Sequence, residues 1–154
     1  MTGSNISPPL TMVERLLVIR TSLFIPIVEF WLRRTSVKVC NASLNQLADW
    51  MPPYRRKVNS IKQAERIASL ITYANRRFSI YPADCLTKSL VLSYSLQRLG
   101  HNAELCLGAR RFTGQFEAHA WIEVDGNPVG EELSVNTIYT RFERENIGPK
   151  GEFH

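Results

Sequence analysis

Cys85 and His119 are the two residues of this sequence whose types and positions best suit nucleophilic catalysis. Cys85 follows Asp84, a residue type that commonly caps helices, and is therefore expected in the first turn of a helix. A helix N-terminus carries partial positive charge, which favours the thiolate, the nucleophilic form of cysteine. His119 can take a proton from the thiol and later give it to a leaving amine. These residues predict a Cys–His pair, although an isolated cysteine is often only a small buried side chain.

An acidic side chain that orients the imidazole would complete such a site. Asp125, Glu131 and Glu132 are the candidates. Asp125 starts an Asp-Gly turn, and turn geometry accounts for an aspartate at that position. A two-residue hairpin at this turn would place Glu132 opposite His119 and Glu131 opposite Ala120, and a one-residue bulge would exchange the two glutamates. The residues alone leave the choice open.

The elements that must position these residues change from helices to strands at Gly100. Apolar residues spaced three and four apart predict helices at Met12–Arg34, Ser43–Trp50, Asn59–Arg77 and from Asp84 through Leu99. Beyond Gly100 the period becomes two, which predicts strands at Ala103–Phe112, Phe116–Val124 and from about Pro128. Helices followed by an antiparallel sheet define an α+β fold.

The strand predicted at Phe116–Val124 carries His119. Alternation puts alanine, isoleucine and valine side chains on one face, and His119 and Trp121 on the other. The fold must therefore bring the start of a helix, at Cys85, next to the middle of this strand.

The stretch Leu16–Leu32 is the most apolar in the chain, but Arg20, Pro26 and Glu29 interrupt it. Its apolar run is too short to span a bilayer, and the features of a signal peptide are absent. We expect a partly buried pair of helices bent at Pro26. Docking of a protein partner or of a membrane surface is the alternative for Met12–Trp50.

Length and composition suit one globular domain. The chain has 154 residues, 44 % of them hydrophobic and 21 % charged, so it can bury a core. The net charge of +5 indicates an acidic partner but does not indicate nucleic acid. Three cysteines, Cys40, Cys85 and Cys106, form an odd set that predicts reduced thiols in a cytoplasmic protein. Cys40, Cys106 and His101 lack the spacing of a metal site, and no metal is expected.

Three runs of residues resemble one known family: Cys85-Leu-Thr-Lys-Ser-Leu90, Leu99-Gly-His-Asn-Ala-Glu-Leu-Cys-Leu-Gly-Ala-Arg110 and Phe116-Glu-Ala-His-Ala-Trp-Ile-Glu-Val-Asp-Gly126. Together they are similar to the transglutaminase-like cysteine peptidases that mature lasso peptides in bacteria. The resemblance covers residues 80–133 and implies a Cys-His-Asp triad with papain-like geometry. Cys85 matches the family nucleophile and His119 its base. The family's aspartate usually lies twelve residues after the histidine, and this sequence has Glu131 there.

The resemblance implies a cysteine endopeptidase that removes the leader from a ribosomally synthesised lasso-peptide precursor and needs no cofactor. Its implied partners are the precursor peptide, a separate leader-recognition protein and a lasso cyclase. The chain is similar to the stand-alone form of the peptidase, without a fused leader-recognition domain. We therefore expect residues 1–154 to form a single domain, with a helical N-terminal part at 10–78 and a transglutaminase-like catalytic core at 79–145.

Two other functions use the same fold. An acyl transferase would use the same Cys–His pair but pass the acyl group to an amine instead of water. A catalytically silent module would retain the fold and bind an acidic peptide or protein through its scattered arginine pairs.

Overall fold

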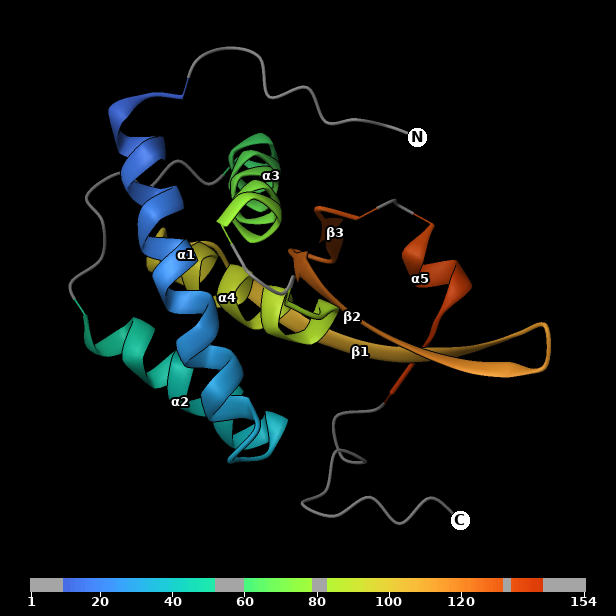
Figure 1. The fold of residues 1–154 in the computed structure, drawn as a ribbon. Coiled ribbons are helices and arrows are strands. Elements are labelled where there is room, and N and C mark those ends of the chain that lie inside the picture. Colours follow the sequence, from blue (N-terminus) through green and yellow to red (C-terminus); the bar gives the residue numbers. More distant parts are fainter. Residues whose placement is uncertain (1–9, 52–59, 79–82, 132–133, 143–154) are drawn as a thin grey trace.

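The computed structural model describes residues 10–51, 60–78, 83–131 and 134–142, and within them the chain forms helices followed by an antiparallel sheet (Figure 1). The helices are α1 (Met12–Leu32), α2 (Val37–Trp50), α3 (Ile61–Phe78), α4 (Cys85–Arg98) and α5 (Val135–Ile138). The strands are β1 (Ala103–Phe112), β2 (Gln115–Val124), β3 (Asn127–Val129) and β4 (Thr140–Arg141), in the spatial order β3-β2-β1-β4. The predicted α+β fold is confirmed.

Helix α1 is a single helix that continues through Pro26. The prediction of two helices bent at Pro26 was therefore wrong. Proline lacks the N–H that would bond one turn back, but tertiary packing compensates for this loss. Ile25 and Val28, on either side of Pro26, are buried in the main core. Among the helices of the described residues, none combines the length and the apolar character needed to cross a membrane.

An ion pair joins the first turn of α1 to α3. Glu14 Oε1 accepts a hydrogen bond from Arg66 Nε at 2.7 Å, and Glu14 also forms a capping box with Thr11. Chiefly because of the Arg66 hydrogen bond, the pKa of Glu14 falls from 4.5 to about 2. A carboxylate whose pKa is lowered by folding stabilises the fold above its unfolded pKa, and this contribution is lost as the pH falls through the folded pKa.

We expect Glu14→Gln to lower the free energy of unfolding by about 1–2 kcal/mol at pH 7. The difference from wild type should shrink below pH 4.5 and become small near pH 2, where about half of the Glu14 carboxylates of the folded wild type are protonated. Urea unfolding across this pH range measures the effect, with exposed Asp49→Asn as a matched control that changes little. A difference that stays constant down to pH 2 would contradict the role assigned to this pair.

The second and third helices differ in how well the sequence predicted them. Helix α2 begins at Val37 rather than at Ser43, because the Ser36 side chain accepts a hydrogen bond from the Val39 N–H and caps an earlier start. Helix α3 agrees with its predicted range to within two residues. Apolar spacing predicts one buried face at Ile61, Ala64, Ile67, Ile71 and Ala74; the last four are buried, and Ile61, in the first turn, is exposed.

Helix α4 packs against α1, α2 and α3 on one side and against the sheet on the other (Figure 1). The predicted cap is confirmed, since Asp84 Oδ1 accepts from the Thr87 N–H at 2.8 Å. The helix ends in a Schellman motif, in which Gly100 takes a φ of 85° and the His101 N–H donates to the Leu96 carbonyl at 3.0 Å. Strong signals at both ends thus fix the position of this helix.

The β2–β3 hairpin has the predicted register. Asp125 and Gly126 have φ values of 50° and 80°, as a two-residue type I′ turn requires. Ile122 pairs with Val129, which is the pairing that such a turn dictates. The ladder stops at Val129, so it does not continue to Ala120.

Strands β1 and β2 form a long hairpin whose tip extends beyond the helices (Figure 1). Its turn is at Thr113 and Gly114, with φ values of 48° and 81°. Phe112 and Phe116, near the tip, are exposed.

Both faces of the sheet are covered near its centre. On one face, Ile122 and Val124 of β2 join the main core with α4. On the other, the Trp121 side chain packs with Cys106, Val135 and Tyr139. The chain from α5 to β4 therefore covers the face of β2 that carries His119.

Candidate active site

Cys85 is the first residue of α4, and three contacts set its position. Asp84 caps the helix, as described above. Buried Asn75 of α3 holds Ala83 through two hydrogen bonds: Asn75 Oδ1 accepts from the Ala83 N–H at 2.9 Å, and Asn75 Nδ2 donates to the Ala83 carbonyl at 3.3 Å. One turn into the helix, Ser89 Oγ donates to the Ala120 carbonyl of β2 at 3.0 Å. The helix start is therefore tied both to α3 and to the strand segment next to His119.

His119 and Glu131 are brought together, with His119 Nε2 at 3.3 Å from Glu131 Oε1. Their side chains are 21 % and 31 % exposed, so the pair is partly shielded from water. The contact uses one imidazole nitrogen and leaves Nδ1 for another partner. Of the three acidic candidates, Glu131 is thus in contact with the imidazole.

Gly130 explains how Glu131 reaches His119 although the hairpin register points it toward Ala120. Gly130 follows the last ladder residue and has a φ of 73°, a conformation that favours glycine. Its N–H donates to the carboxylate of Glu65 at 3.1 and 3.2 Å. The chain therefore leaves the β-ladder at Gly130, and the register no longer determines where Glu131 lies.

A water-sized pocket of about 30 Å³ lies between α3, α4 and the β2–β3 hairpin. Cys85 and Glu131 both line it, together with Ser89, Trp121 and Lys88. Cys85 and Glu131 thus border a common space near the N-terminal end of α4, where the helix dipole is positive, and His119 is not among the residues that line this space.

Two aromatic rings flank His119. Its ring centroid lies 5.1 Å from that of Tyr139 and 6.2 Å from that of Trp121. Tyr139 OH donates to Glu117 Oε1 at 2.9 Å, and Arg110 Nε donates to Glu117 Oε2 at 2.7 Å. Contacts with Arg110 and then Tyr139 lower the pKa of Glu117, while burial and the Glu117 hydrogen bond raise the pKa of Tyr139. This network restrains the imidazole from the side opposite α4.

Sequence reasoning missed Tyr139. It lies beyond the recognised runs, in a segment with no motif, and only the return of the chain across the sheet brings it to His119. The alternation in β2 correctly placed Trp121 on the same face as His119. It did not predict that this face is covered and that Trp121 is buried.

Of the other two acidic candidates, only Asp125 lies in the described residues, and it is not in contact with His119. Asp125 lies in the turn at the far end of β2, six residues and about 20 Å along the strand from His119. Its charge acts on His101, whose pKa is lowered by burial and partly restored by Asp125. Glu132 lies outside the residues that the structure describes.

The remaining thiols are unsuited to nucleophilic chemistry. Burial raises the pKa of Cys40, and burial together with the charge of Glu123 raises the pKa of Cys106 to about 12. Both are buried and Cys85 is half-exposed, and none of the three forms a disulfide. Within the described ranges, no group of three His, Cys, Asp or Glu side chains is arranged to hold a metal ion.

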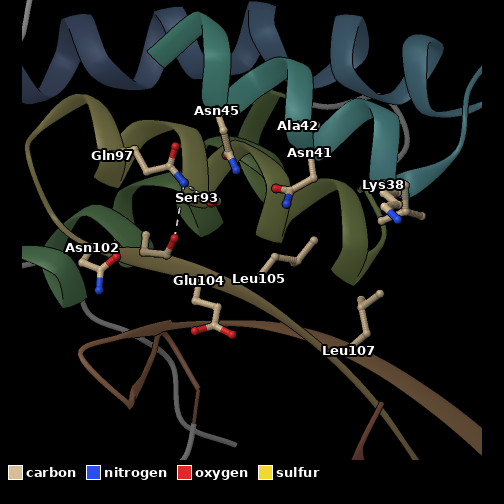
Figure 2. Close-up of a pocket in the computed structure, with 12 residues that line it drawn as sticks. Lys38, Asn41, Ala42, Asn45, Ser93, Gln97, Asn102, Glu104, Leu105 and Leu107 are labelled. Carbon is tan, nitrogen blue, oxygen red and sulfur yellow. Dashed lines mark hydrogen bonds between the residues drawn. The ribbon is translucent and has the colours of Figure 1, made fainter. Parts of the chain in front are cut away.

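A larger pocket lies between α2, α4 and β1 (Figure 2). It has a volume of about 440 Å³ and is lined mainly by amide and aliphatic side chains, among them Asn41, Asn45, Gln97 and Leu105. None of Cys85, His119 and Glu131 lines it. The three candidate catalytic residues therefore lie outside this larger pocket.

The fold is α+β, with a helix that begins at a cysteine and packs on an antiparallel sheet. A protein-family model described as the transglutaminase-like superfamily matches residues 28–144, which is more than half of the chain. The chain belongs to the transglutaminase-like superfamily, whose members are usually cysteine hydrolases or transferases. Comparisons with curated proteins and with solved structures gave no match.

Proposed function

We propose that this chain is a cysteine endopeptidase in which Cys85 is the nucleophile, His119 the general base and acid, and Glu131 the residue that orients the imidazole. The observation that carries the proposal is the 3.3 Å contact of His119 with Glu131, beside a pocket that Glu131 shares with Cys85. A thiol, an imidazole and a carboxylate in this order are the components of amide cleavage through a thioester.

In the proposed reaction, His119 takes the proton of the Cys85 thiol, and the sulfur attacks the carbonyl carbon of the scissile amide. The N–H of Cys85, at the start of α4, helps to hold the oxyanion. The C–N bond then breaks, and the leaving amine takes the proton from His119. Water, deprotonated by His119, attacks the thioester, and the C–S bond breaks to release the acid and regenerate the thiol.

The proposed substrate is the leader–core junction of a lasso-peptide precursor in the bacterial cytoplasm. The supporting observation is the resemblance of the runs around Cys85 and His119 to the lasso-peptide leader peptidases. A separate leader-recognition protein would deliver the precursor, and a lasso cyclase would receive the freed core amine. Exposed Phe112 and Phe116 on the β1–β2 hairpin offer apolar contacts to a peptide that reaches His119.

The proposal treats residues 1–154 as one domain. One continuous cluster of buried side chains supports this view, since it joins Val28 of α1, Leu44 of α2 and Ile71 of α3 to Leu90 of α4 and Ile122 of β2. The helices at 10–78 would then support the catalytic core at 79–145 directly.

An acyl transferase is the second candidate, because the same three residues would form the same thioester. The superfamily contains both hydrolases and transferases. Mass spectrometry distinguishes the two: hydrolysis gives fragments whose masses add up to the substrate plus one water, and transfer gives a conjugate with an added amine.

Thiol labelling tests whether the site is active at all. We expect iodoacetamide at neutral pH to modify Cys85 much faster than Cys40 and Cys106, because those thiols are buried and have raised pKa values. Peptide mapping of the folded protein measures the three rates. An unreactive Cys85 would instead favour the catalytically silent binding module.

A further inference from the structure

Helix α1 carries an apolar seam on the face that points away from the core. The seam consists of Met12, Leu16, Ile19, Leu23, Pro26 and Phe30, spaced alternately four and three residues apart, and all six are exposed. The opposite face of α1 is buried through Val18, Thr21, Ile25 and Val28. Alternation of four and three is the pattern of a helix that packs along another helix. Helix α1 runs along the outside of the molecule (Figure 1).

The spacing of the seam reads the same in both directions. A second α1 laid antiparallel on the first would pair Met12 with Phe30, Leu16 with Pro26, and Ile19 with Leu23, each pair occurring twice. A two-fold axis that crosses the seam midway between Ile19 and Leu23 generates all of these contacts. Such self-complementarity is what a symmetric dimer requires.

The residues that flank the seam agree with this arrangement. In an antiparallel pair, Arg15 of one chain faces Glu29 of the other, and Val13 faces Ile27. Both apolar flanking residues expose more than half of their surface. Arg33 contacts only Oε1 of Glu29, at 2.7 Å, so Arg15 of the second chain would meet the other oxygen.

A parallel pair fits less well. It would place Arg15 against Arg20 of the other chain, and like charges repel. In the antiparallel pair, Arg20 faces only its own copy, a single contact at the axis, and Arg15 is paired with an acidic residue. Charge complementarity therefore selects the antiparallel arrangement.

The exposed apolar area of the seam and its apolar flanking residues is close to that of a protein–protein interface. Val13, Ile27 and the five large seam residues, at about 100 Å² of apolar surface each, give about 700 Å² per chain. A standard interface buries about 800 Å² per partner, and a monomer seldom exposes so large an apolar patch. We propose that α1 forms the antiparallel helix pair of a symmetric homodimer. The proposal is independent of the catalytic residues and extends beyond the function proposed above.

Sedimentation velocity of the full chain at micromolar concentrations tests the dimer. We expect twice the chain mass of 17.6 kDa for the wild type and a monomer for Ile19→Glu/Leu23→Glu. Trp50→Glu, an exposed apolar residue on α2, is the matched control and should remain dimeric. Circular dichroism melting checks that each variant folds. A monomeric wild type, or a folded Ile19→Glu/Leu23→Glu variant that stays dimeric, overturns the proposal.

Exchanging the charges of Arg15 and Glu29 tests the antiparallel geometry and leaves the apolar side chains of the seam unchanged. Arg15→Glu alone and Glu29→Arg alone should each weaken the dimer about tenfold, and the double variant should recover most of the affinity. Single variants that weaken the dimer without recovery in the double variant contradict the pairing. Binding of a monomeric wild type to phosphatidylserine–phosphatidylcholine vesicles would assign the seam to a membrane surface instead.

Discussion

Replacing Cys85 with alanine is expected to abolish precursor cleavage, with kcat reduced by about 10⁴-fold or more. The variant loses the only thiol that is not buried, and neither Cys40 nor Cys106 can substitute because their pKa values are raised. Alanine at the first position of α4 keeps the helix, since the cap is made by Asp84. The measurement is the rate of cleaved product by mass spectrometry, with the precursor peptide and its leader-recognition protein present.

Cys106→Ala is the matched control for this experiment. Cys106 packs under Trp121 and Val135, so its loss should lower stability by about 1 kcal/mol and leave cleavage by the folded protein intact. Undiminished cleavage by the Cys85→Ala protein would remove the proposed mechanism. Loss of cleavage in both variants would indicate a structural effect, which thermal melting of each protein would reveal.

The second large effect is expected at Glu131. Glu131→Ala should lower kcat by about 10²-fold with little change in KM, because the carboxylate acts through His119 and does not hold the substrate. Glu131→Gln keeps an oxygen that can accept from the imidazole, and we expect it to retain more activity than alanine. Steady-state kinetics of the three proteins separate kcat from KM, and a dominant rise in KM would point to a substrate-binding role.

Glu132→Gln provides the neighbouring control. If Glu131 orients His119, as the 3.3 Å contact suggests, Glu131→Gln slows the reaction more than Glu132→Gln. The reverse order would mean that Glu132 is the third member of the triad. Glu117→Gln adds a second comparison, since Glu117 contacts Tyr139 beside the imidazole and not the imidazole itself.

Features with strong local signals were predictable from the sequence. The Asp84 cap and the Gly100 stop define α4, and therefore the place of Cys85, because each is satisfied by hydrogen bonds within a few residues. The turn at Asp125 and Gly126 likewise fixed the register of β3, because two positive φ values select a two-residue hairpin.

Features that depend on distant parts of the chain were not predictable. Helix α1 passes through Pro26 because the nearby Ile25 and Val28 are buried in the core, and local helix propensity does not reveal burial of this kind. Glu131 turns toward His119 because Glu65 of α3, distant in the sequence, accepts a hydrogen bond from the Gly130 N–H. Tyr139 reaches the imidazole only because the chain crosses the sheet after β3.

The side-chain amide of Asn75 couples the place of Cys85 to helix α3. Two hydrogen bonds, one to each backbone polar group of Ala83, anchor the chain just ahead of the nucleophile. The position of the chain just before α4 therefore depends on a side chain of α3, so a substitution of Asn75 would displace Cys85 without touching it.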